Sequence, residues 1–212
     1  MAQFTGHLVL VVGPSGAGKD SVLRGAAAEL TADPRFVFPR RIVTRAADAD
    51  AEDHGSMDEM EFERAAADDA FALWWNAHGN SYGVPKSIED ELVAGRIVAV
   101  NVSRSVLAAA IERYPHVIVA EVTASPEILV SRIVARGRES EAEALKRVDR
   151  KVPSFPSGVP VVRIVNNGEL AFAIDEFCAL LLRLLNAGIT SPDWEDVEEA
   201  GDDDDGRLAA AG

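Results

Sequence analysis

The segment LVLVVGPSGAGKDSVL, residues 8–23, decides the fold of this chain. Its first five residues are Leu and Val without interruption, the composition of a parallel strand that is covered on both faces. The next seven, GPSGAGK, place glycines in a tight turn with a lysine at its end, and apolar residues at helical spacing follow. A strand, a glycine-rich loop and a helix in this order predict a phosphate-binding loop, in which backbone N–H groups and the helix N-terminus face a nucleotide's phosphates.

The loop sequence assigns a set of residues to a nucleotide. Lys19 ends the motif, where its ammonium group reaches the β and γ phosphates. A glycine-rich turn with an incidental lysine is the alternative, but the preceding strand and following helix favour nucleotide binding. The predicted nucleotide-binding residues of the loop are Gly13, Pro14, Ser15, Gly16, Ala17, Gly18, Lys19, Asp20 and Ser21.

The eighth position of the loop departs from the usual pattern. A Ser or Thr hydroxyl normally stands there and holds Mg²⁺, whereas this chain has Asp20 followed by Ser21. A carboxylate is a hard oxygen ligand that suits Mg²⁺, but it also brings negative charge close to the triphosphate. We therefore predict Mg²⁺ as a cofactor, with either Asp20 or Ser21 as its ligand.

Short β-type runs alternate with helical segments along the rest of the chain, an order that predicts an α/β fold with a parallel sheet. Four of the runs are nearly continuous in Val, Ile and Leu, as expected of doubly covered strands. The expected strands are residues 8–12, part of 36–43, 71–76, 97–102, 117–122 and 161–165.

Helix signals lie between these runs. Ser56 with Glu59 has the spacing of a capping box ahead of a helix over 57–67, and Ser125-Pro126 predicts a helix start before 128–135. Helical spacing also covers 141–151 and 170–186, and Gly95 ends a helix over 86–94. We expect one kinase-like domain over residues 1–188 and a disordered acidic tail over 189–212, because that tail lacks a sustained period and is dense in like charges.

Composition limits the classes of protein and partner. The formal net charge of the 212 residues is −14, and the segment 190–212 holds nine acids against one arginine, so generic nucleic-acid binding is disfavoured. The apolar run at residues 8–12 is too short to cross a bilayer. The chain has one cysteine, Cys178, among apolar neighbours. We expect a cytoplasmic protein without membrane or nucleic-acid partners, and the choice between monomer and homodimer stays open.

Several further motifs, taken with the loop, resemble the guanylate-kinase-like branch of the P-loop phosphotransferases over about 180 residues. They are VTR (43–45), HGNSYGVP (78–85), Ser125-Pro126 before a helix, RGRE (136–139), Lys146-Arg147 and VNN (165–167). The resemblance implies a parallel sheet covered by helices, with small substrate-binding and lid insertions.

The acceptor side departs from the guanylate kinase pattern. That pattern has acidic side chains that bind guanine near strand 71–76 and at the end of strand 97–102, where this chain has Trp74-Trp75 and Asn101. The second phosphate-binding arginine of the pattern is replaced by Asp48. Losing groups aimed at a buried base edge removes specificity by orders of magnitude, so a guanine acceptor is not expected.

The variant motifs GPSGAGKDS, RIVTR, WWNAHGNSYGVP, VNVSR and RGRE closely resemble the ribose 1,5-bisphosphate phosphokinase family. The resemblance implies ATP-dependent phosphorylation of ribose 1,5-bisphosphate, a small sugar phosphate, to 5-phosphoribosyl 1-diphosphate. An anionic phosphate oxygen is the nucleophile in such a transfer, so positioning and neutralisation should dominate catalysis.

The candidate residues follow from these motifs and from the chemistry of phosphates. We predict Lys19, Arg136 and Arg147 as catalytic, and Asn166 beside the adenine of ATP. Cations and hydroxyl-bonding groups should bind an acceptor that has two phosphates and no base. The predicted substrate-binding residues are Arg41, Arg45, Tyr82, Asn101, Ser103 and Arg104.

Three other functions stay open at the level of sequence. One is a nucleoside monophosphate kinase of altered base choice, and another is a non-catalytic guanylate-kinase-like interaction module, against which Lys19 counts. A third is a small-molecule kinase that phosphorylates a hydroxyl group and needs a carboxylate base, which Asp48, Asp50 or Asp53 would supply.

Overall fold

A computed structural model of the chain describes residues 3–44, 54–135, 140–148 and 154–186. Several sequence-based expectations lie outside these ranges: Arg45, the three aspartates at 48, 50 and 53, Arg136 with the rest of the RGRE motif, and the acidic tail. The backbone of Arg147 is described, but its side chain is not.

The larger sheet has five parallel strands in the order β2-β7-β1-β8-β9. This arrangement confirms the predicted α/β fold with a parallel sheet, and β1 lies at its centre directly before the phosphate-binding loop. The strand bounds are β1 His7–Val12, β2 Phe36–Val37, β7 Ile97–Asn101, β8 Val117–Thr123 and β9 Val161–Val165.

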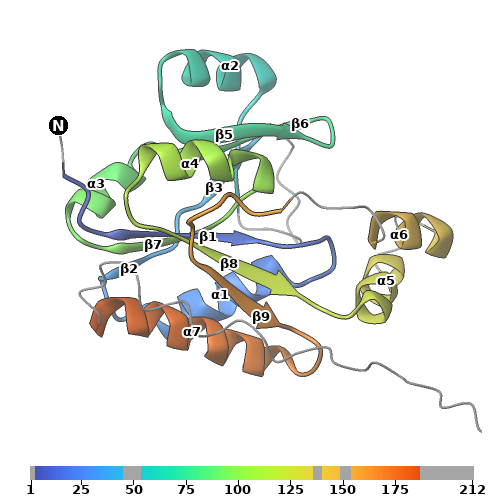
Figure 1. Cartoon of the computed structure of the whole chain (residues 1–212). Helices are drawn as coiled ribbons and strands as arrows, with labels where there is room; N and C mark the ends of the chain where they lie inside the picture. Colours follow the sequence, from blue (N-terminus) through green and yellow to red (C-terminus); the bar gives the residue numbers. More distant parts are fainter. Residues whose placement is uncertain (1–2, 45–53, 136–139, 149–153, 187–212) are drawn as a thin grey trace, which may run out of the picture.

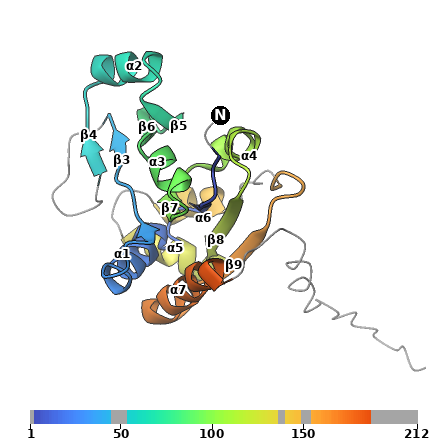
Figure 2. The same ribbon diagram turned by 90° about the vertical axis from the view of Figure 1, so that its left-hand side faces the viewer.

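Helices cover both faces of this sheet (Figures 1 and 2). One face packs against α1 and α7, and its core includes Val9, Val11 and Phe177, all fully buried. The other face packs beneath α3, α4 and the second sheet, around Leu8, Leu10 and neighbouring side chains. The helix bounds are α1 Lys19–Glu29, α2 Glu59–Ala67, α3 Ile88–Val93, α4 Leu107–Arg113, α5 Pro126–Ala135, α6 Glu141–Val148 and α7 Leu170–Asn186, and a short 3₁₀ turn, η1, spans Arg104–Val106.

A second sheet of four strands, in the order β4-β3-β6-β5, stands over the first with α2 on its far side (Figure 1). Its strands are β3 Arg41–Val43, β4 His54–Ser56, β5 Phe71–Ala77 and β6 Asn80–Pro85. Strands β5 and β6 form an antiparallel hairpin, whose turn residues His78 and Gly79 both have positive φ, 53° and 75°. The sequence prediction missed β4 and β6, and it merged β2 with β3, which belong to different sheets.

Two local predictions need correction. The capping box that opens α2 is formed by Asp58 and Glu61, not by Ser56 and Glu59: the Asp58 side chain accepts from the Glu61 N–H at 2.8 Å. Strand β9 is not covered on both faces, because it lies at the sheet edge with Val161, Arg163 and Val165 exposed. Among the described residues, no helix has the length and apolar composition needed to span a membrane.

Candidate active site

The phosphate-binding loop connects the end of β1 to the start of α1, as the sequence predicted. Gly13 has φ 147°, and a side-chain carbon there would lie 1.9 Å from the Val122 carbonyl oxygen. Gly18, the N-cap of α1, has φ 91° and would clash similarly with Asn166. Both positions therefore require glycine. The Lys19 ammonium group donates to the carbonyl oxygens of Gly13 and Pro14 at 2.9 and 3.0 Å, which holds it over the loop.

Asn166 packs beneath this loop. Its side chain is 3% exposed, and its Nδ2 donates to the Ala17 carbonyl at 2.8 Å, so the turn after β9 is tied to the loop after β1. Its Oδ1 has no hydrogen-bond partner among the described residues. The structure thus places this predicted ATP-binding residue against the loop itself.

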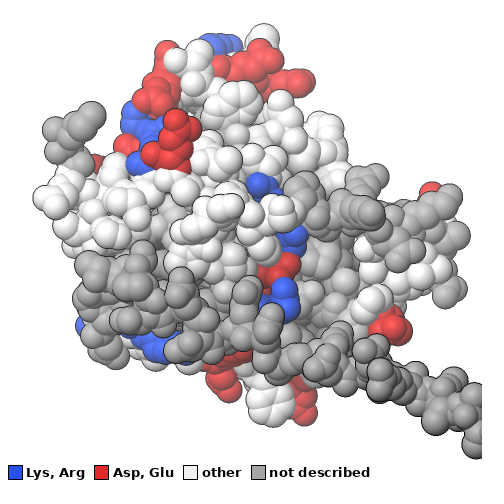
Figure 3. All heavy atoms as spheres, viewed as in Figure 1, with Lys and Arg blue, Asp and Glu red and all other residues white. Residues whose placement is uncertain are grey.

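A cleft of about 510 Å³ opens beside the loop and extends to the second sheet. Lys19, Arg24 and Arg41 line it with a single carboxylate, that of Asp20, so its described lining carries more positive than negative charge. This contrasts with the net charge of −14 and with the acidic side chains that gather over α2 in Figure 3. Such a local reversal of sign attracts anionic phosphates.

Side chains from β3, β5 and β6 form the wall of the cleft that faces the loop. Trp75 and Tyr82 stack with ring centroids 5.4 Å apart and planes inclined by 6°. The Arg41 guanidinium carbon lies 5.9 Å from the centre of the Tyr82 ring. Because adjacent strand residues point to opposite faces, Trp74 lies on the other side of the sheet, where it is 50% exposed.

Asp20 connects the two sides of the cleft. Its Oδ1 accepts from Asn101 Nδ2 at 2.6 Å and from an Arg41 nitrogen at 3.4 Å. Asn101 ends β7, Arg41 begins β3, and Asp20 lies in the first turn of α1. The structure therefore brings together one predicted metal ligand and two predicted substrate-binding residues, although 81 positions separate Asp20 from Asn101.

Arg104 lies apart from this group. Its guanidinium pairs with Glu121, a carboxylate on β8 that is 8% exposed, and lies 4.6 Å from the centre of the Phe155 ring. Arg163 on β9 pairs with the other oxygen of Glu121 at 3.1 Å. Arg104 is not among the described residues that line the cleft, and its contacts make it part of an ion-pair cluster at the β8–β9 side of the sheet.

The remaining cleft residues include some that the sequence did not single out. Ser103 lines the cleft and accepts from the Ser105 hydroxyl at 2.9 Å. Arg24, one helical turn after Asp20, also lines it, and the spacing of four on α1 was the signal that could have found it. Arg132 on α5 donates to the Gly16 carbonyl at 3.5 Å, a contact with no local sequence signal.

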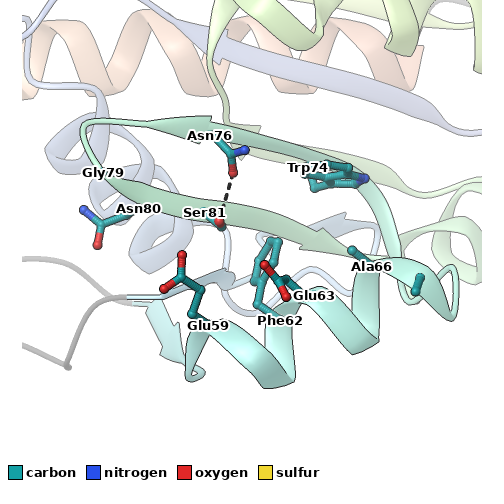
Figure 4. Close-up of a pocket in the computed structure, with 10 residues that line it drawn as sticks. Glu59, Phe62, Glu63, Ala66, Trp74, Asn76, Gly79, Asn80 and Ser81 are labelled. Atoms are coloured by element: carbon teal, nitrogen blue, oxygen red, sulfur yellow. Dashed lines mark hydrogen bonds between the residues drawn. The ribbon is translucent and has the colours of Figure 1, made fainter.

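A second cavity, of about 570 Å³, lies between α2 and the outer face of the β5–β6 hairpin (Figure 4). Glu59 and Glu63 stand along its α2 side, Trp74 lies on its strand side, and Ser81 donates to Asn76 at 2.9 Å across the hairpin. Its described lining holds two carboxylates and no Lys or Arg. The cavity therefore does not suit phosphates, and the cleft at the loop is the candidate active site.

Comparison with known proteins identifies close relatives in sequence. The chain is 46% identical over 183 residues to ribose 1,5-bisphosphate phosphokinase PhnN of Methylobacterium radiotolerans, covering 86% of this chain and 98% of that protein. It is 41% identical over 178 residues to a bifunctional ribose 1,5-bisphosphokinase-thymidine phosphorylase of Azorhizobium caulinodans. That match covers 84% of this chain but 26% of the bifunctional protein, so the chain spans about a quarter of that relative's length.

Comparison with solved structures supports the fold. Guanylate kinase from Anaplasma phagocytophilum superimposes with a TM-score of 0.58 at 20% sequence identity, over 87% of each chain. At this identity the likeness shows a shared fold and nothing more specific. No protein-family model matches the chain.

Proposed function

The chain belongs to the ribose 1,5-bisphosphate phosphokinase family, and on that premise we propose that it transfers the γ-phosphoryl group of ATP to the 1-phosphate of ribose 1,5-bisphosphate. The products are 5-phosphoribosyl 1-diphosphate and ADP. The nucleophile is a phosphate oxygen that is already anionic, so no general base is required. Catalysis then depends on aligning the two phosphates and neutralising their charge.

The donor subsite is formed by the phosphate-binding loop. Backbone N–H groups between Gly13 and Lys19 and the N-terminus of α1 bind the β and γ phosphates, and the Lys19 ammonium group moves from the loop carbonyls onto them. On the family motifs we propose Arg136 and Arg147 as the arginines that neutralise the transferred group. Asn166 supports the loop from below, and on the family motif we propose that it borders the nucleotide.

Mg²⁺ fits the oxygen donors at the start of α1. The described residues contain no cluster of three or more His, Cys, Asp or Glu side chains, so a cation here would take most of its ligands from phosphates and water. Asp20 and Ser21 both line the cleft next to Lys19 and would hold it. When bound, the cation offsets negative charge on the donor phosphates.

The observation that carries the proposal of a base-free acceptor is the composition of the far wall. Arg41, Asn101, Tyr82 and Ser103 offer one cation and three hydrogen-bonding groups. The single carboxylate in the described lining, Asp20, lies on the loop helix and not on the acceptor wall. A site that recognises guanine in the guanylate kinase pattern has acidic side chains aimed at the edge of the base. A site for a sugar bisphosphate instead needs cations for the phosphates and hydrogen-bonding groups for the hydroxyls.

A side-by-side assay of acceptors tests the proposal. Purified protein is incubated with ATP, Mg²⁺ and either ribose 1,5-bisphosphate or GMP, ADP release is followed by a coupled assay, and the sugar product is identified by ³¹P NMR. We expect turnover with the bisphosphate and a diphosphate signal at the 1-position. Turnover with GMP and none with ribose 1,5-bisphosphate would refute the proposal.

Two variants test the catalytic residues in the same assay. Lys19→Met should abolish turnover, because the loop holds the Lys19 ammonium group where the donor phosphates would bind. Arg147→Ala should lower kcat by about 10³ or more with a small change in the KM for ATP, as for arginines that neutralise a phosphoryl transition state. An Arg147→Ala enzyme with unchanged kcat would remove that residue from the catalytic group.

A further inference from the structure

Asp20 occupies the loop position where a neutral hydroxyl is usual, and its contacts suggest why a charge stands there. Its Oδ1 accepts from Asn101 at 2.6 Å and pairs with Arg41 at 3.4 Å. The Asp20 side chain is 35% exposed and that of Arg41 is 11% exposed, so the pair lies partly within the cleft wall. A serine or threonine hydroxyl has no charge to pair with the guanidinium.

Arg41 is placed to bind a phosphate as well as this carboxylate. Its guanidinium lies near the face of Tyr82, which itself stacks on Trp75, and all three residues line the cleft. Carboxylates and phosphates both accept hydrogen bonds from the planar guanidinium group of arginine. A phosphate dianion carries more negative charge than a carboxylate and has a third oxygen that can accept. An acceptor phosphate that enters the cleft therefore competes with Asp20 for Arg41.

Displacement of Asp20 has a consequence on the donor side. Asp20 directly follows Lys19, in the first turn of the helix whose N-terminus faces the donor phosphates. Once the charge of Arg41 is directed to the acceptor, the carboxylate is released next to the donor phosphates. A carboxylate oxygen at that position is the ligand type that Mg²⁺ prefers.

We infer that Asp20 couples the two substrates: it occupies Arg41 until an acceptor phosphate takes that guanidinium, and it is then available to the cation that accompanies ATP. Acceptor and metal–nucleotide therefore bind with positive cooperativity, and each raises the affinity for the other by the same factor. The identity of the acceptor rests on the proposed function, but the competition between Asp20 and an anion does not.

The competition is tested by calorimetry with inorganic phosphate, in EDTA and with ADP present to fill the phosphate-binding loop. In Asp20→Asn the amide oxygen still accepts from Asn101, but the charge that competes for Arg41 is gone. We expect phosphate to bind about twofold to fivefold more tightly, the factor that corresponds to losing a partly exposed ion pair. Arg41→Gln should weaken phosphate binding and remove this gain when combined with Asp20→Asn.

Asp33→Asn is the matched control, because Asp33 pairs with Arg35 on the surface and does not line the cleft. Equal tightening in Asp33→Asn and Asp20→Asn, or unchanged or weaker phosphate binding in Asp20→Asn, would overturn the inference. Thermal unfolding of each variant shows whether it is folded. A folded Asp20→Asn protein makes the titration decisive.

The coupling is tested with the magnesium complex of a non-hydrolysable ATP analogue, titrated with and without saturating ribose 1,5-bisphosphate. We expect the bisphosphate to tighten binding of the analogue to the unaltered protein and to leave its binding to Asp20→Asn unchanged. Coupling of equal size in both proteins would overturn the second half of the inference. If ribose 1,5-bisphosphate is neither bound nor phosphorylated, the proposed function fails, while the phosphate titration still decides the competition.

Discussion

Substituting Asn166 with alanine removes the contact that ties the turn after β9 to the phosphate-binding loop. Asn166 Nδ2 donates to the carbonyl of Ala17, a residue with no exposed surface, so water cannot replace the lost donor without a rearrangement. Leaving a buried carbonyl unpaired costs about 1–3 kcal/mol. The vacated space adds to this cost, while removal of the unpartnered Oδ1 offsets part of it. We therefore expect the free energy of unfolding to fall by about 2 kcal/mol.

Urea denaturation and calorimetry measure this loss directly. For a domain of this size about 2 kcal/mol corresponds to a decrease in Tm of roughly 4–8 °C. Asn167→Ala is the matched control, because the neighbouring Asn167 accepts from the Ser125 N–H at 2.7 Å in an exposed position, where water can replace it. Equal losses of stability in the two variants would show that the buried contact has no special weight.

Enzyme kinetics of Asn166→Ala show whether the residue also supports nucleotide binding, apart from its effect on folding stability. The Asn166 amide donates to the Ala17 carbonyl at 2.8 Å and lies close to Gly18, so it holds the backbone of the loop in place. We expect Asn166→Ala to raise the KM for ATP at a temperature where the protein is fully folded, with a smaller effect on the KM for the acceptor. An unchanged KM for ATP would remove Asn166 from the nucleotide-binding residues.

Three further predictions concern other parts of the molecule. Gly13→Ala should prevent folding or remove ATP binding, because the added carbon meets a β8 carbonyl at 1.9 Å, whereas Gly168→Ala, with no atom within 4 Å, should melt like the parent in a thermal scan. Burial, together with the nearby charge of His116, lowers the pKa of His7 below 6.5. As the pH falls, the unfolded chain therefore takes up the proton first, and the free energy of unfolding measured in urea should decrease from pH 7.5 to pH 5.5. His7→Gln should make this pH dependence smaller. Burial raises the pKa of the Cys178 thiol to about 12, so Ellman's reagent should label it slowly at pH 8 in the folded protein and rapidly in urea, and equal rates would contradict its burial.

The large sheet was predictable because its signals are local. Strands β1, β7 and β8 are short apolar runs buried on both faces, and the glycine loop between β1 and α1 has its own spacing. The second sheet was not, because β6 reads NSYGVP, with a glycine, a proline and polar residues where a strand usually has branched side chains. It forms because the turn at His78 and Gly79 pairs it with β5.

The site was predictable where residues follow one another and not where the fold brings them together. Lys19 and the loop glycines form a continuous motif, and the structure places them as expected. Glu121, which holds Arg104 away from the cleft lining, sits within a buried apolar strand and gives no pattern to detect. The contact of Asp20 with Asn101 joins residues 81 positions apart, so it depends on β1 and β7 being neighbours in the sheet.

The two departures from the guanylate kinase pattern are best understood as one change. In that pattern an acidic side chain ends the strand equivalent to β7 and a neutral hydroxyl occupies the eighth loop position. Here an amide, Asn101, ends β7 and a carboxylate, Asp20, occupies the loop, and the two are in contact at 2.6 Å. Compared with that pattern, the carboxylate is therefore on the loop helix at Asp20 and not on the acceptor wall at Asn101. An acceptor with two phosphates gains from this change, because the acceptor wall keeps Arg41 without a carboxylate of its own, and the carboxylate that pairs with Arg41 lies on the loop helix, from where an acceptor phosphate can displace it.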